Sequence, residues 1–395
     1  MNPVINLIKN RAKDIHPLIV SYRRHFHQHP ELSFEEFETS NFIKEFLIQN
    51  NIPFKDGYVK TGIVASVKGN KPGKTILLRA DMDALPILEQ SVQPYSSKNT
   101  GVMHACGHDV HSASLMGTAL ILNDLKEFIA GEVKFIFQPG EEVLPGGASL
   151  MIKEGALGNP LPVSIMGQHV FPQLEVGKVG FRKGKYMAST DEVYITVKGK
   201  GGHGAMPHLN IDPITTAAQL IIALQQLVSR LATPDIPTVL SFGKIIGNGA
   251  TNVIPDEVKL EGTFRTFDEE WRNNAHHKIR EIAQTTAAAF GASCEVNIVR
   301  GYPFLVNDNK TTQLALDGAV EYLGEHNVVD LDLRMTAEDF AYYSQLMPAC
   351  FYRLGTGNNQ KGITSNVHTA TFDIDEKALE VGSGLMAYLA IKQLM

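Results

Sequence analysis

The sequence contains little cysteine and no long apolar run. Its three cysteines, at positions 106, 294 and 350, are too few and too scattered for a disulfide framework. No run of about 18 apolar residues, the length of a membrane helix, occurs in the chain. The stretch MNPVINLIKNRAKDIHPLIV at the start lacks the apolar core of a secretory signal because Lys, Arg and Asp interrupt it. We therefore expect a cytoplasmic protein with no membrane contact.

An excess of positive charge is also missing. The chain carries 36 basic and 42 acidic residues, which gives a formal net charge of -6, and the charges form no block of one sign. This balance argues against a nucleic-acid partner, which would select a basic surface. Small molecules or peptides are the expected substrates.

The pattern of apolar runs predicts two domains. At 395 residues the chain is longer than one hydrophobic core usually grows. From about residue 60, the short runs GIVASV, TILLRA, VKFIFQ and VSIMGQ alternate with helical segments near residues 110–127 and 147–155. This alternation predicts an α/β domain with a largely parallel central sheet.

A different order of elements begins near residue 187. A strand, a helix opened by Asp212, two strands, a long helix and a last strand follow one another. The order β-α-β-β-α-β is that of the ferredoxin-like fold. We expect residues 187–300 to form a small domain inserted into a larger one that consists of residues 1–186 and 301–395.

The scarce coordinating side chains are concentrated in HACGHDVH, residues 104–111. Cys106 and His108 are separated only by Gly107, which lets the backbone bend so that both side chains can face one ion. Thiolate and imidazole suit zinc, and added carboxylates widen the choice toward manganese and other divalent ions. A buried Cys and His pair without a metal is the alternative interpretation.

Other polar side chains follow predicted strands. Glu141 and Glu142 come after VKFIF, His169 after VSIMG, and His368 after ACFYRLG and a loop. Carboxyl ends of parallel strands share one edge of a sheet, so these residues can converge there. One glutamate can bind a metal while the other faces the reacting water, and spacing does not say which does which.

The remaining polar residues of this region have several possible roles. Asp81 and Asp83 could bind a metal, orient a ligand histidine or cap the next turn. His104, Asp109 and His111 share the HACGHDVH motif and could simply support it.

The predicted small domain has candidates of its own. His203 is flanked by glycines that would allow close approach to a substrate carbonyl, and Arg265 offers a planar fork for a carboxylate. Asn252 could add a hydrogen bond. The alternatives are turn glycines, a turn asparagine and a surface arginine. We expect His276 and His277 to be solvated.

Eight motifs together resemble a known family. In order, they are RRHFHQHPELSFEE, LRADMDALP, MHACGHDVH, FQPGEE, GKGGHGAMPH, NVIPD, GTFR and AEDF. The chain resembles, over nearly its whole length, the aminoacylase-type metallo-amidohydrolases and metallopeptidases. The resemblance is greatest to the branch of hippurate hydrolases, N-acetyl-diaminopimelate deacetylases and auxin-conjugate (IAA-amino acid) hydrolases. It implies a zinc-peptidase-like catalytic domain and a small domain that dimerises and closes over the substrate as a lid.

The resemblance also implies roles for individual residues. The positions that match the family's ligands for two divalent metal ions are Cys106, His108, Glu142, His169 and His368. Glu141 matches the general base, and Asp83 would orient the metal ligands. His203 would polarise the scissile carbonyl in the neighbouring subunit, with Asn252 and Arg265 near the substrate carboxylate. Other branches carry histidine at the position of Asp81, so Cys106 would take up that coordination here.

The implied function is hydrolysis of the amide bond of N-acyl-amino acids, such as hippurate or N-acetyl-amino acids, with water activated by metal and a glutamate base. The expected metals are zinc or manganese, with nickel or cobalt as further options, and the expected assembly is a homodimer or higher homo-oligomer. A metallo-dipeptidase or carboxypeptidase is the alternative within enzymes. A non-catalytic metal-dependent binding protein is the alternative outside them.

Overall fold

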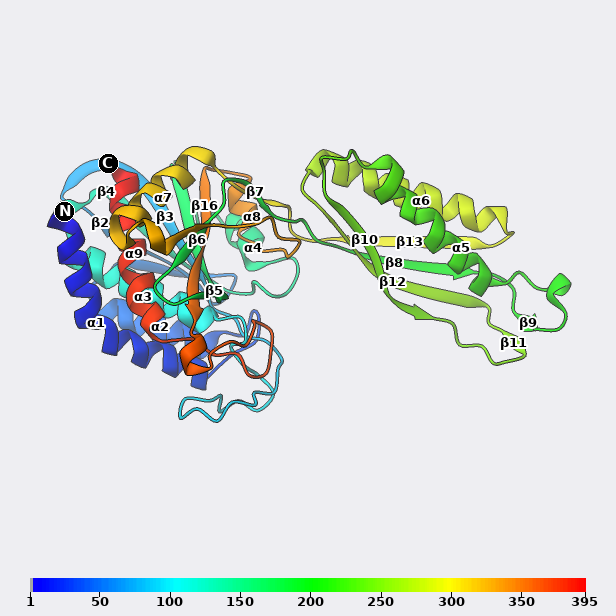
Figure 1. Ribbon diagram of the computed structural model, residues 1–395, viewed down its shortest axis with the longest axis horizontal. Coiled ribbons are helices and arrows are strands. Elements are labelled where there is room, and N and C mark those ends of the chain that lie inside the picture. The colour runs from blue at the N-terminus through cyan, green and yellow to red at the C-terminus, as the bar shows by residue number, and fades with distance from the viewer. Residues whose placement is uncertain (1–2) are drawn as a thin grey trace. The chain divides into compact units, whose positions relative to one another are not determined.

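The computed structural model describes residues 3–395, which form two compact units (Figure 1). The large unit comprises residues 1–186, 306–333 and 339–395, of which residues 1 and 2 lie outside the described part. The small unit comprises residues 187–305 and 334–338. The segments 301–305 and 334–338 therefore belong to the small unit and not, as predicted, to the large one. The reason is backbone pairing: Gly301 N–H donates to Thr190 O at 3.0 Å, and Ala188 N–H donates to Arg334 O at 3.1 Å.

A mixed sheet forms the centre of the large unit, with strand order β1-β2-β4-β3-β5-β16-β6-β15. The strands are β1 (Phe54–Tyr58), β2 (Gly62–Lys68), β3 (Lys71–Asp81), β4 (Ala130–Gln138), β5 (Ser164–Glu175), β6 (Val179–Phe181), β15 (Val328–Asp330) and β16 (Ala349–Gly357). The central strands β4, β3, β5 and β16 run parallel, which confirms the predicted mostly parallel sheet. GIVASV, in β2, differs in running antiparallel to β4.

Helices cover this sheet. They are α1 (Pro3–Gln28), α2 (Phe37–Gln49), α3 (His108–Asp124), α4 (Gly147–Lys153), α7 (Asn309–Leu323), α8 (Ala341–Ser344) and α9 (Lys377–Leu394). Figure 1 shows α1, α3 and α9 side by side, and all three contribute buried apolar side chains to one core. Helix α3 is buried on every face from His108 to Leu122. Each buried Leu or Ile there contributes about 1.5–3 kcal/mol, so the helix that begins at the coordinating motif is firmly held.

The small unit has a four-stranded sheet in the order β10-β12-β8-β13, with antiparallel neighbours. Its elements follow the predicted sequence: β8 (Asp191–Lys198), α5 (Pro213–Gln226), β10 (Thr238–Ile246), β12 (Glu257–Thr266), α6 (Glu269–Ala289) and β13 (Ser293–Arg300). Helix α5 begins where predicted because the Asp212 carboxylate accepts the Ile214 and Thr215 N–H groups.

Short elements complete the chain. Two small ladders pair β9 (Gly202–His203) with β11 (Val253–Ile254) and β7 (Gly184–Met187) with β14 (Leu305–Asn307). The short helices are η1 (Lys126–Phe128), η2 (Pro207–Leu209), η3 (Leu227–Leu231), η4 (Glu325–Asn327) and η5 (Asn359–Lys361). Among the helices of residues 3–395, none is long and apolar enough to cross a membrane.

The prediction that His276 is solvated is wrong. His276 is buried on α6, and its Nε2 lies 2.7 Å from Asp191 Oδ2. The Arg272 guanidinium donates to both Asp191 oxygens, at 2.9 and 2.6 Å. Although burial raises the pKa of Asp191, hydrogen bonds from His276 and Arg272 outweigh it and lower that pKa to about 2. The buried carboxylate of β8 thus has its hydrogen bonds supplied by the imidazole and guanidinium of α6.

Candidate metal centre

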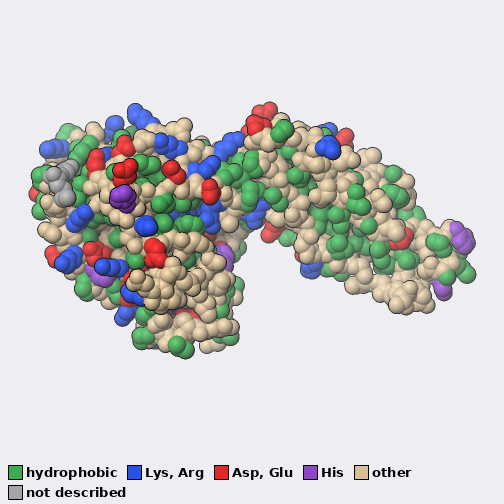
Figure 2. Space-filling view, in the orientation of Figure 1, with side chains coloured by type: hydrophobic (Ala, Val, Ile, Leu, Met, Phe, Trp, Pro, Cys, Tyr) green, Lys and Arg blue, Asp and Glu red, His purple; other side chains and the backbone are tan. Residues whose placement is uncertain are grey.

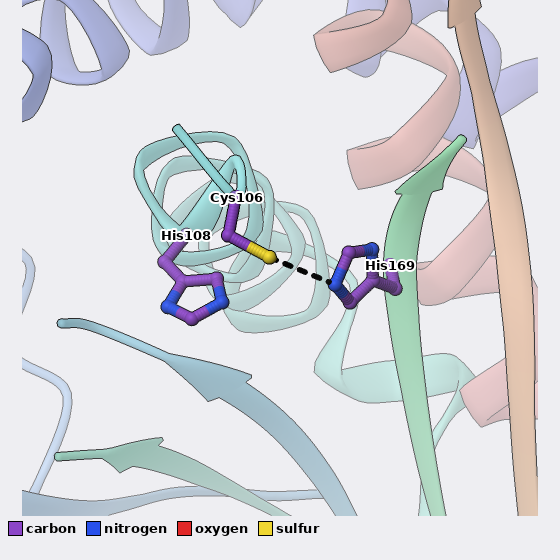
Figure 3. A group of neighbouring side chains, drawn as sticks. All are labelled: Cys106, His108 and His169. Atoms are coloured by element: carbon purple, nitrogen blue, oxygen red, sulfur yellow. Dashed lines mark hydrogen bonds between the residues drawn. The ribbon is translucent and has the colours of Figure 1, made fainter. Parts of the chain in front are cut away.

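The HACGHDVH motif folds as a sharp turn into α3. Gly107 is the N-cap residue and has φ +81°, a left-handed conformation that glycine adopts without strain. A Cβ at this position would lie 2.6 Å from Val170 Cγ2, so a larger residue would also clash. The turn places Cys106 before the helix and His108 at its first position, with both side chains facing the same space (Figure 3). This is the bend that the sequence predicts.

Side chains from β5 and the loop after β16 join this pair. Cys106 Sγ lies 3.4 Å from His169 Nε2 and 3.3 Å from His368 Nε2. His368 Nε2 lies 3.3 Å from Glu142 Oε1. Two groups of donor atoms therefore lie within 4.8 Å of one another, Cys106 with His108 and His169, and Cys106 with Glu142 and His368. The five predicted metal ligands come together in the fold.

His169 and His368 reach this place from different kinds of backbone. His169 lies inside strand β5, opposite Arg353 of β16, so the prediction that it follows the strand is wrong. The parallel partner β16 extends the strand past the expected end. His368 is in a loop and has φ +63°. Its backbone N–H donates to Ala105 O at 2.7 Å, which fixes it beside Cys106.

Two buried atoms of the cluster have no hydrogen-bond partner. They are His108 Nε2 and Glu142 Oε1, which lie 3.9 Å apart, and Glu142 Oε1 has only an ionic contact with His368. A buried polar atom left unpaired costs about 1–3 kcal/mol, so such atoms normally have a ligand. A thiolate, imidazoles and a carboxylate with free lone pairs fit one or more divalent metal ions.

Asp83 holds two of these side chains in place. Its Oδ1 lies 3.1 Å from His108 Nδ1, and its Oδ2 accepts the Glu142 N–H at 2.9 Å and the Ser33 hydroxyl at 2.6 Å. Because the carboxylate accepts a hydrogen bond from Nδ1–H, a neutral His108 keeps its Nε2 lone pair for an ion. Of the roles left open for Asp83, the geometry supports orientation of a ligand histidine.

Both carboxylate oxygens of Asp81 already have partners. Arg79 donates to its Oδ2 at 2.6 Å, and His111 Nδ1 lies 2.5 Å from its Oδ1. Burial raises the pKa of Asp81, but Arg79, His108 and His111 together lower it well below its usual range. Asp81, His108 and His111 also have donor atoms within 4.8 Å of one another. An ion there would have to displace the guanidinium, so this group fits a metal less well.

The loop that carries Glu141 and Glu142 is held by residues that the sequence did not single out. Gly140 has φ +61°, and its N–H donates to the buried Glu36 carboxylate at 2.8 Å. The Asp339 N–H donates to Glu141 Oε1 at 3.3 Å. Glu36 belongs to HPELSFEE and Asp339 to AEDF, so the only signal for either was membership of a motif. Glu141 itself lies beside His108 and Glu142, with donor atoms within 4.8 Å.

Comparison with known proteins identifies the family. The sequence matches Peptidase family M20/M25/M40 over residues 77–392. This chain is a member of that family. It is 40% identical over 377 residues to an N-acetyl-L-cysteine deacetylase of Bacillus subtilis, a match that covers 95% of this chain and 88% of the relative.

Two further relatives extend the comparison. Thermostable carboxypeptidase 2 of Saccharolobus solfataricus is 39% identical over 393 residues, and the match covers 98% of each chain. A dinuclear metal-binding peptidase of the M20 family from Bacillus subtilis has a crystal structure that superposes with a TM-score of 0.84 at 38% identity, covering 97% of this chain and 99% of that one. The α/β fold with its mostly parallel sheet is thus that of M20 peptidases.

The electrostatics of this M20 site differ between its histidines. The Cys106 and Glu142 side chains, each 3.3 Å from its Nε2, raise the pKa of His368 to about 10. Burial, together with Arg353, lowers the pKa of His169 well below its usual value. Burial and Glu142 raise the pKa of the Cys106 thiol. A metal ion bound by Cys106 and His368 would therefore release protons, because a ligand thiol or imidazole must lose its proton first.

Three predicted site residues of the M20 chain lie in the small unit. His203 is exposed on β9, and its Nδ1 accepts the Ala205 N–H at 3.0 Å, so a neutral ring carries its proton at Nε2. Asn252 is exposed in the turn before β11, where its backbone carbonyl accepts a hydrogen bond from the Gly204 N–H. Arg265 lies on β12, and burial lowers its pKa. Its guanidinium donates to Met335 O at 3.4 Å.

Proposed function

We propose that this chain is a metal-dependent amidohydrolase that cleaves N-acyl-amino acids into a carboxylic acid and a free amino acid. The observation that carries the proposal is the cluster of donor atoms from Cys106, His108, His169, Glu142 and His368 beside Glu141, in which the buried His108 Nε2 and Glu142 Oε1 make no hydrogen bond. The 40% identical N-acetyl-L-cysteine deacetylase supports an acylated amino acid as substrate.

We further propose that the cluster holds two divalent ions that share Cys106. One would be held with His108 and His169 and the other with Glu142 and His368, which are the two groups of neighbouring donor atoms. The 38% identical dinuclear M20 peptidase supports this number. Zinc or manganese suits the donor set best, and nickel or cobalt is compatible with it. When bound, such ions polarise a carbonyl and lower the pKa of a water molecule.

Glu141 is the proposed general base. Its carboxylate would take a proton from the attacking water and pass it to the leaving amine. The Asp339 N–H at 3.3 Å helps to hold one of its oxygens. Asp83 is the proposed positioning residue, because it fixes His108 through Nδ1 and Glu142 through its backbone N–H.

The small unit is proposed to contribute to substrate binding as a lid. His203 presents an N–H at Nε2 and would donate to the oxyanion that forms from the scissile carbonyl of the neighbouring subunit. Arg265 is partly desolvated and donates to a backbone carbonyl, so its guanidinium would bind the substrate carboxylate, with Asn252 nearby.

A homodimer is the proposed assembly. Apolar residues of α5, β10 and β12 line a groove of about 490 Å³ on the small unit, among them Ile214, Ile221 and Ile245. Figure 2 shows hydrophobic side chains spread over this unit, and Ile245 is 60% exposed. A second copy would cover them.

All three cysteines are free, which supports the expectation of a cytoplasmic enzyme.

A metallo-carboxypeptidase or dipeptidase is the second candidate function. The 39% identical thermostable carboxypeptidase favours it, because a peptide bond is also an amide and the same site could cleave it. The two candidates differ in whether the substrate amine is acylated by a simple acid or by an amino acid.

The deciding experiment measures amine release from hippurate, N-acetyl-amino acids and unblocked dipeptides. The protein is stripped of metal and then supplied with zinc, manganese, cobalt or nickel. Release from acylated amino acids that stops with chelator is the expected result. Cleavage confined to dipeptides would establish the peptidase. No amine release from any substrate, with two ions bound, would favour a binding protein.

A further inference from the structure

His111 is buried behind the metal centre, and both of its ring nitrogens have partners. Its Nε2 lies 2.9 Å from the Val170 backbone nitrogen, and its Nδ1 lies 2.5 Å from Asp81 Oδ1. A backbone N–H can only donate, so Nε2 of His111 accepts. Nδ1 therefore carries the proton and donates to the carboxylate. The tautomer of His111 follows from these two partners.

The backbone of the same residue, Val170, also fixes His169. Its Nδ1 lies 2.8 Å from the Val170 carbonyl oxygen. A carbonyl only accepts, so His169 carries its proton at Nδ1 and has its lone pair at Nε2, the atom that faces Cys106 Sγ at 3.4 Å. Val170 therefore links the two histidines: its N–H binds one ring and its carbonyl binds the other.

The strand pairing explains why a side chain is needed at this point. Strand β3 pairs with β5 from Ile76 opposite Ser164 to Arg79 opposite Gly167. Beyond Gly167 the β3–β5 ladder ends, although β5 continues to Glu175. Backbone groups there need other partners. His111, held through Asp81 by the Arg79 guanidinium at 2.6 Å, supplies one of them.

We infer that His111 is a positioning residue that sets the orientation of His169 through the backbone of Val170, without binding an ion itself. The inference rests on the proposed function in one respect, because it takes His169 as a metal ligand. It follows that His111 acts selectively on the ion held by Cys106, His108 and His169. The ion held by Cys106, Glu142 and His368 should be nearly independent of it.

The test is a stepwise calorimetric titration of metal-stripped protein with zinc, repeated with manganese, in competition with a chelator. His111→Asn keeps a donor for Asp81 but has no atom at the position of Nε2, whereas His111→Gln has a carbonyl oxygen that can accept the Val170 N–H. We expect the asparagine variant to bind one ion as the wild type does and the other about 10- to 100-fold more weakly. The glutamine variant should bind both ions with nearly wild-type affinity.

Thr118→Ala is the matched control. Thr118 is buried on the same helix, but its hydroxyl donates to Ser114 O and Ser383 O, away from the cluster. It should lower the melting temperature and leave both binding steps unchanged. Equal binding by the asparagine variant, equal loss of both ions, or a glutamine variant as weak as the asparagine variant would each overturn the inference. Wild-type protein that binds no ion would instead overturn the proposed function, and the inference with it.

Discussion

The two units each bury a cluster of charged and titratable side chains, and the clusters differ in one respect. In the small unit, the Asp191 carboxylate accepts hydrogen bonds from Arg272 and His276. Arg272 also donates to Thr190 O and Gly301 O. In the large unit, His108 Nε2 and Glu142 Oε1 are equally buried but have no hydrogen-bond partner. The first cluster is complete within the chain, whereas the second has unused donor atoms.

This difference separates a structural cluster from a binding site. A buried charge is tolerated when hydrogen bonds and an opposite charge compensate it, and then its role is to hold the fold together. Unpaired donor atoms carry a free-energy penalty that a bound ion removes. Changes in the complete cluster should therefore alter stability, and changes in the incomplete one should alter metal content and activity.

The largest effect is expected from Glu141→Gln. It removes the proposed base but no proposed ligand, so the protein should retain its ions while turnover falls on the order of 100- to 10,000-fold. Metal content per chain and amine release, measured on the same sample, check this. The neighbouring isosteric variant Glu142→Gln is the control and should lose metal affinity instead. Metal lost from the first variant would contradict the division of roles.

Removal of an ion should have a large effect on stability as well as on activity. His368→Ala deletes a side chain that contacts both Cys106 and Glu142, so this variant should bind fewer ions. An ion that binds only the folded state at a hundred times its dissociation constant adds about 2.7 kcal/mol of stability. Added zinc should therefore raise the melting temperature of the wild type more than that of His368→Ala. An equal rise in both would show that His368 is no ligand.

An intermediate effect is expected at Arg265. If its guanidinium binds the substrate carboxylate, Arg265→Gln loses a charge-assisted interaction and kcat/KM should fall about 10- to 100-fold, mainly through KM. Steady-state kinetics with N-acetyl-amino acids measure this, and an N-acyl amine without a carboxylate is the control substrate. The control should be cleaved equally by both proteins. An equal loss of activity toward both substrates would mean that Arg265 has a structural role and does not bind the substrate carboxylate.

The sequence predicted the members of the incomplete cluster better than its surroundings. Cys106 and His108 share one short motif, and Glu142 follows a strand whose end is visible in the apolar pattern. Ser33 and Glu36 act on Asp83 and on the backbone of Gly140, far away in sequence, and no periodicity reveals such contacts.

The complete cluster was missed for a similar reason. His276 occurs on a helix rich in charge and amide, which is typical of a solvated face. Its partner Asp191 is 85 positions away on β8, and only the fold brings them within 2.7 Å. A local pattern gives the face of a helix that is polar, but it does not give the polar partner that allows this face to be buried.

The smallest expected effect is a loss of folding stability at low pH, and it contrasts most sharply with the metal centre. The pKa of Asp191 is lowered from 3.8 to about 2 in the folded protein. A lowered pKa means that the folded state holds the carboxylate ionised, so its contribution is fully present above pH 3.8 and is lost as pH falls through about 2. This shift corresponds to about 2 kcal/mol. Urea unfolding of metal-free protein between pH 5 and pH 2 should show this loss. Asp191→Asn should be less stable near neutrality and lack this component of the acid dependence, with its ion binding unchanged. An acid dependence identical to that of the wild type would mean that other carboxylates control it.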